Sequence, residues 1–477
     1  MTQVPVLIAG AGPTGLVLAL WLTKIGIKVR IIDKALEKET TSRALVIHAR
    51  TLEFYRQLQI SDDVVKAGFK FPALNLWVNH KPKARVQLAD VGEGLTPFPY
   101  IIILPQDQHE ELLLNKLKEL GVEVERDAEL ADFEQNEKSV IAKILKGDGT
   151  IETITTDYLA GCDGAHSIVR KKLDVGFEGS TYPHMFYVAD VIGSGPALNG
   201  ELHVSLDKSE FMAFFPLKQT GHARLIGVIR EDQKADPKKD PTWEDVNPRL
   251  LKEMDVTIAQ VKWFSKYRVH HRVASHFQKD RVFILGDASH IHSPLGGQGM
   301  NTGIGDAVNL AWKLGEVLKG NFEERLLSSY ETERISFAKQ LVKTTDRAFR
   351  FISNDGPIAR FVRTKAIPLI LPQIFKRAST GSFVFRTLSQ TGITYNPHPA
   401  NSVIELQTGD RLPWIASVDN FKFLQSLDWQ VHIYGERTIE SKYVIHSFAW
   451  NDEMKEKRLK KDVAYLIRPD GYIAEIL

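Results

Sequence analysis

The chain opens with a short apolar run, Val4 to Ala9, that a glycine-rich segment follows directly. Continuous apolar runs of this length, bounded by glycine, are typical of buried parallel strands. An apolar stretch from Pro13 towards Ile25 predicts a helix, and Lys28 to Ile32 predicts a second strand. The pattern is that of a strand–turn–helix–strand unit in a parallel sheet.

Further along the chain the pattern alternates between helical and strand-like stretches. A helix is predicted over Gln106 to Leu120, and a strand over Arg281 to Leu285 leads through a loop to a helix from about Gly303 to Leu318. Four strands are predicted between these elements: Met185 to Val191, Glu201 to Leu206, Phe211 to Pro216 and Ala223 to Arg230. We expect one composite body in which a sheet is inserted between parts of a parallel α/β unit.

The first glycine-rich segment, GAGPTG at 10–15, joins the first strand to the first helix, and Asp33 ends the second strand. In this context GxGxxG is a dinucleotide-binding fingerprint. Gly10 allows the tight turn, Gly12 lets the backbone approach a pyrophosphate, and Gly15 lets the helix pack closely on the strand. Free N–H groups at the helix start attract phosphates, and the carboxylate suits ribose hydroxyls. We therefore expect a bound dinucleotide.

A second glycine-rich loop indicates which nucleotide this is. Gly286 and Asp287 stand at the end of the strand at 281–285, and the loop SPLGGQGMNT at 293–302 leads into the next helix. Asp287 suits a ribityl hydroxyl, while loop amides and the helix dipole suit the electron-rich pyrimidine edge of a flavin. The competing interpretation is a flexible glycine turn, but two loops of this type in one chain favour a flavin nucleotide.

Together these motifs resemble group A flavoprotein monooxygenases of the para-hydroxybenzoate hydroxylase fold, over roughly residues 4 to 395. The segment CDGAHSIVR at 162–170 resembles the family's DG motif, associated with FAD and NAD(P)H. Residues 286–287 and 294–314 resemble its GD motif. Ser42-Arg43-Ala44, with Arg50-Thr51-Leu52-Glu53, resembles the segment that brings an arginine to the flavin. Leu104-Pro105-Gln106, with Glu110 and Leu113, resembles the segment whose glutamine meets FAD.

The resemblance implies an α/β fold: a Rossmann-like FAD-binding domain interleaved with a β-sheet substrate domain, plus a short thioredoxin-like C-terminal extension. The closest likeness is to phenol, polyketide and phenylpropionate hydroxylases and to rifampicin monooxygenase. Residues 409–413 and 466–474 resemble the start and end of that extension, which contains no cysteine and so no redox pair. The expected divisions are 1-72, 104-176 and 276-345 for FAD binding, 73-103 and 177-275 for the substrate sheet, 346-399 for a helical linker and 400-477 for the extension.

The motifs and the resemblance together assign the residues of the site. Pro294, Gly296 and Gly297 are expected to line the site where oxygen reacts, and no catalytic residue is assigned. The expected cofactor-binding residues are Gly10, Gly12, Pro13, Thr14, Gly15, Asp33, Lys34, Arg43, Gln106, Asp163, Gly164, Arg170, Gly286, Asp287, Pro294, Gly297, Gly299, Met300 and Asn301.

The resemblance also implies the reaction. Noncovalent FAD is reduced by NADH or NADPH, which binds transiently, and O₂ then forms a flavin C4a-hydroperoxide that transfers one oxygen atom to a phenolic, polyketide or antibiotic-like aromatic substrate. Phenol hydroxylases carry an acid where this chain has Leu45 and Val46. Tyr187, His203, His222 and Arg224 lie on predicted strands and are expected to pack rather than act as a base. Phe211, Met212, Phe214 and Phe215 suit either an aromatic pocket or a sheet core.

Three other functions stay open. An FAD oxidoreductase would use the same cofactor without oxygen insertion, and a flavin-binding protein would perform no chemistry. A flavin-dependent halogenase shares the fold, but its tryptophan-x-tryptophan signature is absent, because Val78 and Asn79 follow Trp77. His290 and His292 with their neighbouring serines suggest a zinc site or a triad, but they lie in the GD loop and are expected to pack there. No metal is expected.

Composition narrows the remaining classes. The chain has 477 residues, with 61 basic and 59 acidic side chains and a net charge of +2, so it gives no reason to expect nucleic acid as a partner. The single cysteine, Cys162, is expected to be inert and fits a reducing cytoplasm. The apolar run Ile367 to Phe375 is too short to span a bilayer, and no membrane partner is expected. A cytoplasmic enzyme, monomer or homodimer, is the expectation.

Overall fold

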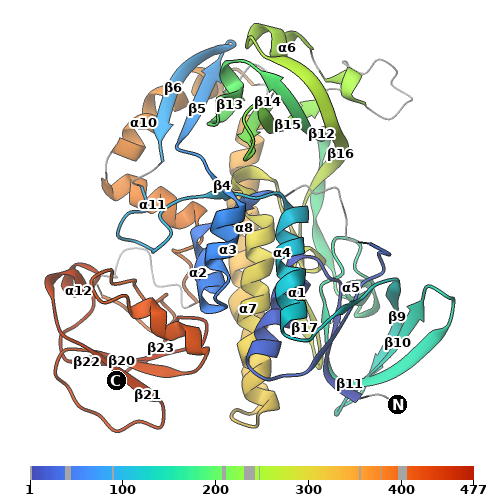
Figure 1. The fold of residues 1–477 in the computed structure, drawn as a ribbon, viewed down its shortest axis with the longest axis vertical. Helices are drawn as coiled ribbons and strands as arrows, with labels where there is room; N and C mark the ends of the chain where they lie inside the picture. Colours follow the sequence, from blue (N-terminus) through green and yellow to red (C-terminus); the bar gives the residue numbers. More distant parts are fainter. Residues whose placement is uncertain are drawn as a thin grey trace.

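The computed structural model describes residues 3–37, 44–88, 91–206, 211–229, 242–246, 248–353, 356–376, 378–395 and 405–477. Ser42 and Arg43, which the sequence assigns to the flavin, lie outside the described residues. Figure 1 shows one sheet at the top of the molecule, a second at the lower right and a smaller one at the lower left, with long helices in the centre. The expected α/β architecture is confirmed.

The nucleotide-type sheet has the strand order β17-β18-β11-β1-β2-β8, with β10 and β9 continuing from β11. β1 pairs in parallel with β2 and β11, and β11 pairs in parallel with β18. The strands are β1 (Gln3–Ala9), β2 (Val29–Ile32), β8 (Val124–Glu125), β9 (Ala128–Gln135), β10 (Val140–Lys146), β11 (Ile151–Gly161), β17 (Gln278–Lys279) and β18 (Val282–Ile284). The carboxyl ends of β1, β11 and β18, where the three motifs follow, therefore meet at one edge, as ligand sites in such sheets do.

Three helices pack around this sheet: α1 (Pro13–Lys24), α4 (Gln106–Glu119) and α7 (Gly299–Leu318). α1 contacts both others and is buried from Gly15 to Leu22, which explains its continuous apolar sequence. The start of α7 differs from the sequence prediction, because the helix begins at Gly299 and not near Gly303. Glycines have low helix propensity, so the sequence suggested a loop there, but tertiary contacts of the first turn hold it in the helix.

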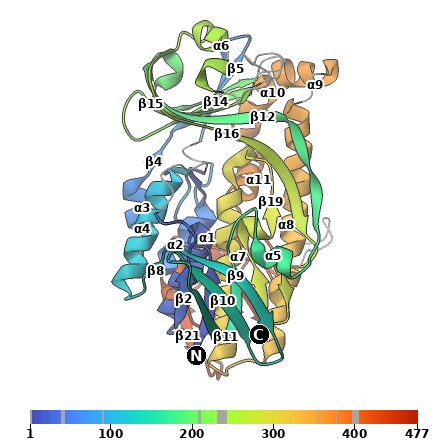
Figure 2. The same ribbon diagram turned by 90° about the vertical axis from the view of Figure 1, so that its right-hand side faces the viewer.

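The second sheet has the strand order β19-β16-β12-β15-β14-β13-β5-β6. Its strands are β5 (Ala73–Val78), β6 (Lys81–Gln87), β12 (Phe177–Ser194), β13 (Leu202–Leu206), β14 (Phe211–Pro216), β15 (His222–Ile229), β16 (Thr257–Ala274) and β19 (His290–Ile291). β12 and β16 are both 18 residues long and run from the top of the molecule down towards the nucleotide-type sheet (Figure 2). The four strands predicted between 185 and 230 all belong to this sheet, but β12 is much longer than predicted.

Short elements fill the junction between the two sheets. β3 (Val46–Ile47), β4 (Phe69–Lys70) and β7 (Ile102–Ile103) form a three-stranded sheet. The helices α2 (Ala49–Gln57) and α3 (Ser61–Ala67) also lie here, whereas α5 (Ile168–Lys172) contacts β9 and β11, and α6 (Pro248–Glu253) lies at the top of the molecule in Figure 1. α2 is buried along almost its whole length, including the charged residues Arg50 and Glu53, so its polar groups must find partners inside the protein.

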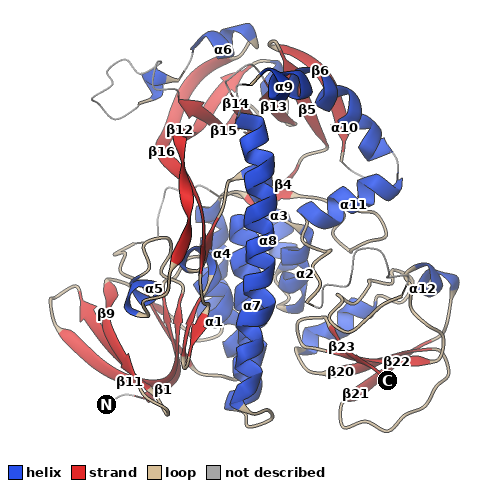
Figure 3. Cartoon of the chain, turned by 180° about the vertical axis from the view of Figure 1, so that it is seen from behind, coloured by secondary structure: helices blue, strands red, loops and turns tan. Residues whose placement is uncertain are grey.

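A helical segment runs along the back of the molecule after α7 (Figure 3). It consists of α8 (Ser328–Ser353), α9 (Pro357–Phe361), a π-helical turn (Val362–Ala366), α10 (Ile367–Lys376) and α11 (Ala378–Leu388). α8 contacts α7 and β16, and α10 contacts β6 at the edge of the second sheet. No helix within the described ranges combines the length and the apolar character needed to cross a bilayer.

The C-terminal extension has its own four-stranded sheet in the order β21-β20-β22-β23. The strands are β20 (Gln430–Tyr434), β21 (Val444–Phe448), β22 (Val463–Ile467) and β23 (Ile473–Ile476), with α12 (Asp452–Glu456) between the second and third. β20 and β21 are parallel, while β20–β22 and β22–β23 are antiparallel. One parallel pair followed by a hairpin is the strand arrangement of a thioredoxin-like sheet, as the resemblance implies.

Candidate functional site

The loop between β1 and α1 approaches its neighbours so closely that glycine is required. Gly10 has φ +105°, and a Cβ built on it would overlap the carbonyl oxygen of Cys162; a Cβ on Gly15 would overlap the carbonyl of Gly10. Gly12 caps α1 and is different, because a Cβ added there meets none of the described residues within 4 Å. The space before the helix start is therefore open, which is what a pyrophosphate at a helix N-terminus needs.

Asp33 at the end of β2 holds this loop in place. Its Oδ2 accepts a hydrogen bond from the Ala11 N–H at 2.7 Å, and its Oδ1 accepts one from the Ala35 N–H at 2.8 Å. Arg126 Nη1 lies 3.6 Å from Oδ1. A carboxylate has about four lone-pair positions, so Asp33 retains acceptor capacity for the ribose hydroxyls that the sequence assigns to it. The neighbouring Lys34 is exposed.

The DG motif follows β11 and lies against the same loop. The Cys162 N–H donates to the Ala9 carbonyl at 2.7 Å. Asp163 Oδ2 accepts from the N–H groups of Ile168 and Val169 at the start of α5, whereas its buried Oδ1 has no partner among the described residues. The other half of the motif is structural, because the Arg170 guanidinium donates to the carbonyls of Ala165 and Ala288. Arg170 thereby joins the DG turn to the GD turn.

Thr14 is the point where the first and third motifs meet. A Cβ on Gly286 would lie 2.7 Å from Thr14 Oγ1, and a Cβ on Gly303 in α7 would overlap the same atom. The Gly286 N–H donates to Asp306 Oδ2 at 3.1 Å, and Asp306 also accepts from Arg334 Nε and lies 2.7 Å from His290 Nε2. Asp306 is fully buried, so it fixes the turn that bears the exposed Asp287.

The loop expected to line the oxygen site, residues 294–297, is fixed through Asn301. Asn301 Nδ2 donates to the carbonyls of Val46 and Gly297, and its Oδ1 accepts from the His48 N–H and the Thr51 hydroxyl, all at 2.8 to 2.9 Å. Gly297 has φ +62° and lies against Val46, whose Cβ would be 2.6 Å from an added Cβ. Asn301 thus ties the loop to the β3–α2 connection.

Several buried polar atoms near this loop and in the DG motif lack a partner among the described residues. They are His48 Nδ1, His292 Nε2, Ser293 Oγ and Asp163 Oδ1. His48 Nε2 donates to the Gly296 carbonyl at 2.8 Å, and His292 Nδ1 donates to the Ser293 carbonyl at 2.8 Å. Burial lowers the pKa of both histidines to about 4, so both rings are neutral near pH 7 and each presents an unfilled acceptor. Buried polar groups are normally paired, so these atoms fit a ligand rich in N–H and hydroxyl donors such as FAD.

Two segments resemble flavin-contacting segments of the family, but side chains in them bond to other parts of the protein. Arg50 donates to Glu53 Oε2 at 2.8 Å and to the Asp470 carbonyl at 2.7 Å, so it faces the C-terminal extension. Gln106 Nε2 donates to Glu110 Oε1 at 2.8 Å, and the Gln106 N–H donates to the Ala44 carbonyl. The sequence did not single out His48 or Asp306. A signal for His48 was present, because this histidine directly precedes α2 and lies between Ala44 and Arg50 in the segment that resembles a flavin-contacting one.

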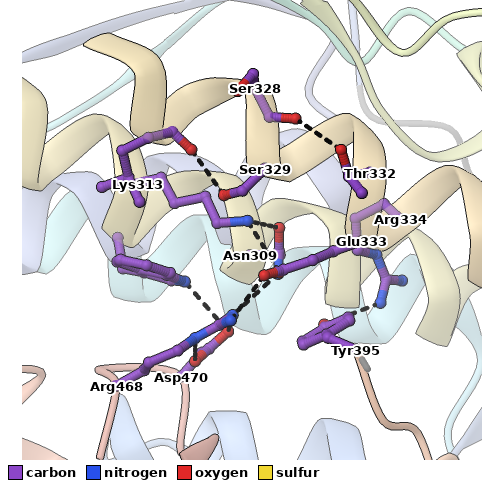
Figure 4. Close-up of polar contacts among 12 residues, drawn as sticks. Asn309, Lys313, Ser328, Ser329, Thr332, Glu333, Arg334, Tyr395, Arg468 and Asp470 are labelled. Atoms are coloured by element: carbon purple, nitrogen blue, oxygen red, sulfur yellow. Dashed lines mark hydrogen bonds and ion pairs between the residues drawn. The ribbon is translucent and has the colours of Figure 1, made fainter. Parts of the chain in front are cut away.

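A buried network of charges links α7 and α8 to the extension (Figure 4). Glu333 accepts from Lys313 Nζ, from Asn309 Nδ2 and from Arg468, which also pairs with Asp470. Burial would raise the pKa of Glu333, but Arg468 and Lys313 lower it to about 2. Burial lowers the pKa of Lys313 to about 8, against the attraction of Glu333. The extension is therefore fixed to the helices behind the nucleotide loops by paired charges.

The second sheet carries Tyr187, His203, His222 and Arg224, which are expected to pack rather than act as a base. Arg224 forms an ion pair with Asp190 at 2.7 Å, and His203 Nδ1 accepts from Trp77 Nε1 at 2.9 Å. Tyr187 stacks on Phe264, and His222 is half-buried at the start of β15. That none of the four acts as a base stays a prediction. Among the described residues, no group of three or more His, Cys, Asp or Glu side chains could hold a metal ion.

The aromatic residues of β14 divide between the two faces of the sheet. Met212 and Phe214 are buried in the core beneath α6 with Trp77 and Tyr187. Phe211 and Phe215 are only partly buried and pack in a different cluster, which contains Leu45, Val46, Trp263 and Tyr267. Because Val46 also contacts Gly297, this second cluster adjoins the loop at 294–297. Met212 and Phe214 thus belong to the core of the sheet, whereas a role for Phe211 and Phe215 in an aromatic pocket stays a prediction.

Comparison with known proteins agrees with this geometry. The family model described as FAD binding domain matches residues 3–345. The 6-methylpretetramide 4-monooxygenase of Streptomyces rimosus is 36% identical over 361 residues, which are 74% of this chain and 63% of that protein. The uncharacterized aromatic compound monooxygenase YhjG of Bacillus subtilis is 29% identical over 99% of this chain and 94% of its own. The OxyS anhydrotetracycline hydroxylase structure from Streptomyces rimosus aligns with a TM-score of 0.76 and 26% identity, over 100% of this chain and 96% of its own. The chain therefore belongs to the FAD binding domain family and has the fold of the FAD-dependent aromatic monooxygenases.

Proposed function

We propose that this protein is an FAD- and NAD(P)H-dependent monooxygenase that inserts one atom of O₂ into an aromatic substrate. The observation that carries the proposal is the position of the aromatic cluster of Phe211 and Phe215. That cluster adjoins the loop at 294–297 through Val46, and the same loop is surrounded by buried acceptors without partners. A flavin held there would have an apolar aromatic surface beside it.

The residues that would hold the cofactor are those at the edge where β1, β11 and β18 end. We propose that Gly12, the open start of α1 and Asp33 bind the pyrophosphate and ribose, and that Asp163, Gly164 and Asp287 contact the remainder of FAD. Pro13, Thr14, Lys34, Arg43, Gln106, Gly286, Gly299 and Met300 complete the proposed set. Noncovalent FAD supplies hydride acceptance from NAD(P)H and activation of O₂.

The chain's own residues would position the reactants and exclude water. Asn301 holds Gly297, and His48 holds Gly296, against the β3–α2 connection, so hydrogen bonds fix the loop lining the proposed oxygen site. His48 and His292 are neutral, so each ring would accept a hydrogen bond from the cofactor without introducing charge. The apolar cluster of Leu45, Val46, Phe211 and Phe215 would keep water from the reacting atoms, which protects a reactive oxygen species from hydrolysis.

We further propose a phenolic or polycyclic aromatic substrate. The relatives named above are a 6-methylpretetramide 4-monooxygenase, an aromatic compound monooxygenase and an anhydrotetracycline hydroxylase. In keeping with them, we assign 1-72, 104-176 and 276-345 to FAD binding, 73-103 and 177-275 to substrate binding, 346-399 to a linker and 400-477 to the extension. Cytoplasmic location stays a prediction from the single cysteine.

The proposal is tested by following both oxygen and reducing equivalents. Holoenzyme, NADPH or NADH, and a panel of phenols, naphthoquinones and tetracycline-like compounds are incubated under ¹⁸O₂. The proposal expects one product that is heavier by a single labelled oxygen atom, with no label from H₂¹⁸O. NAD(P)H oxidation that yields only hydrogen peroxide with every compound would instead indicate an oxidoreductase without oxygen insertion.

A further inference from the structure

The helical segment α9–α11 exposes large apolar side chains to solvent. The exposed fractions are 78% for Ile358, 64% for Phe361, 72% for Leu369, 54% for Ile370 and 71% for Phe383. Figure 3 shows α10 at the outer margin of the molecule beside β6, with α9 above the long helix α8 and α11 below α10. Single exposed apolar residues are ordinary, but five on one short segment mark an interaction surface. We call these five side chains the apolar surface.

α10 has apolar side chains both on the side that packs on the protein and on the side that faces solvent. Ile367 and Leu371 pack on the second sheet in a cluster with Leu76 and Val78, so one side of the helix is already covered. Leu369 and Ile370 lie on the same helix but are 72% and 54% exposed. A helix that is apolar all round is normally covered all round, so the outer side of α10 fits a second apolar environment.

The charged residues of the helical segment itself are all of one sign. Residues 356–395 contain six basic residues and no aspartate or glutamate: Arg360, Arg363, Lys365, Lys376, Arg377 and Arg386. Arg360, Lys365 and Arg386 are exposed in the structure. The edge strand β6, which α10 contacts, exposes Lys81 and Lys83 as well. The partner of this surface must therefore tolerate or attract several positive charges.

A second copy of the chain does not match these charges. In a symmetric dimer centred on this surface, each acid-free segment would face another acid-free segment, and like charges would repel. An anionic lipid surface matches both features, since acyl chains accept apolar side chains and anionic headgroups attract Lys and Arg. We propose that α9–α11 docks the protein peripherally on a membrane that contains anionic phospholipid.

This proposal departs from the expectation, drawn from the sequence, that the chain has no membrane partner. The sequence showed only that the apolar run at 367–375 is too short to span a bilayer. Peripheral docking needs no span, because an amphipathic segment lies in the interfacial plane. The proposal does not depend on the proposed oxygenase reaction, because it uses no residue of the flavin site.

The test is cosedimentation of the full-length holoenzyme with lipid vesicles. Vesicles of phosphatidylcholine are compared with vesicles of phosphatidylcholine and phosphatidylglycerol, at low and high salt. We expect binding to the phosphatidylglycerol vesicles that high salt weakens, since salt screens exposed charges. The double variant Phe361→Ser with Leu369→Ser should lower the partition coefficient between vesicles and solution. We expect about a tenfold loss or more for each apolar side chain removed. The double variant Arg360→Glu with Lys365→Glu should lower the same coefficient, because it reverses two charges that attract the anionic headgroups.

Matched variants separate docking from general surface effects. Ile151→Ser and Val444→Ser remove apolar side chains that are 63% exposed on other elements, and Lys118→Glu reverses a charge on α4; none of these should change vesicle binding. Flavin absorbance checks that each variant is folded. The proposal is overturned if wild-type protein binds neither vesicle type. It is also overturned if sedimentation velocity shows a dimer that Phe361→Ser with Leu369→Ser converts to monomer, because the surface then belongs to a second copy.

Discussion

Asn301 Nδ2 donates to the Val46 carbonyl oxygen at 2.8 Å, although 255 residues separate the two positions in the chain. The same side chain makes three further hydrogen bonds, to His48, Thr51 and Gly297. One amide therefore connects the proposed oxygen-site loop, the start of α7 and the β3–α2 connection, and Val46 brings the aromatic cluster to the same place.

Replacing Asn301 by alanine should loosen all of these connections together. Each lost hydrogen bond is worth about 0.5–1.5 kcal/mol net, so we expect Asn301→Ala to lower the free energy of unfolding by about 2–4 kcal/mol and to weaken FAD binding. Urea unfolding and flavin fluorescence titration measure the two effects. Asn321→Ala, which removes an exposed hydrogen bond to Glu316, is the control and should change neither. Unaltered FAD affinity in Asn301→Ala would show that the loop does not shape the cofactor site.

Gly12 and Gly303 should respond differently to the same substitution. Gly12→Ala adds a methyl group to open space, so the protein without cofactor should keep its stability while FAD affinity falls. Gly303→Ala overlaps Thr14 Oγ1 and should cost about 1–3 kcal/mol as an overpacked core does. Adding Thr14→Ala to Gly303→Ala should restore part of that stability. If the double variant is no more stable than Gly303→Ala, the clash with Thr14 is not the cause.

Stability should fall in mild acid because buried histidines are neutral in the folded protein. Burial lowers the pKa of His48 to about 4 and that of His109 to about 3. Between about pH 6.5 and these values the unfolded chain binds protons that the folded chain does not, so stability decreases as the pH falls through this window. We expect a loss of roughly 1–3 kcal/mol per histidine between pH 7 and pH 4.5. His48→Gln should reduce the slope of stability against pH, and an unchanged slope in this variant would contradict the prediction.

The C-terminal extension should contribute to stability through Arg411. This side chain pairs with Glu53, which is only 3% exposed and also accepts from Arg50 and Thr96. Arg411→Met removes one partner of a buried carboxylate, and such losses cost about 3–5 kcal/mol. Thermal unfolding should show a lower midpoint, and adding Glu53→Gln should recover part of it. Arg325→Met, at a pair exposed by 86% and 78%, should change stability by less than about 1 kcal/mol.

Phe214 and Phe215 are neighbours on β14 that face opposite ways, so they form a matched pair. Phe214 is fully buried, and Phe214→Ala should cost about 3–5 kcal/mol of stability. Phe215 is partly exposed in the cluster that adjoins Val46, so Phe215→Leu should change stability little and raise KM for an aromatic substrate. Steady-state kinetics with the substrate found by the oxygen-labelling experiment measure this. An unchanged KM in Phe215→Leu would place the substrate elsewhere.

The nucleotide-type fold could be predicted because its signals are local. A strand, a turn that only glycine permits and a helix follow one another within about two dozen residues, and the three motifs each repeat part of that pattern. The contacts that complete the site are not local. His48 becomes relevant only because Gly296 approaches its ring, and Asp306 only because Arg334 and His290 do. The pattern of hydrophobic and polar residues does not indicate which distant group a buried side chain will bond to.

The other differences between the sequence-based expectations and the structure also have physical reasons. Along β16, buried and exposed side chains do not alternate regularly, because much of the strand is half-exposed on both faces. The sequence pattern therefore does not predict a strand of 18 residues there. The start of α7 was placed too late because glycines disfavour helix by about 1 kcal/mol each in isolation, whereas Asn301 and Thr302 make fixed contacts inside the protein. Arg50 lies in a motif that resembles a flavin-contacting segment, yet it binds the extension.

The turn that carries Asp287 is one of the connections between the two large sheets. β18 ends at Ile284 in one sheet and β19 begins at His290 in the other, where it pairs with β16. Only residues 285–289 separate them. Asp306 and Arg170 fix this turn through the Gly286 N–H and the Ala288 carbonyl, so contacts from both sheets set the position of Asp287. A substitution that displaces either sheet at this turn would therefore change the affinity for the cofactor as well as the stability of the fold.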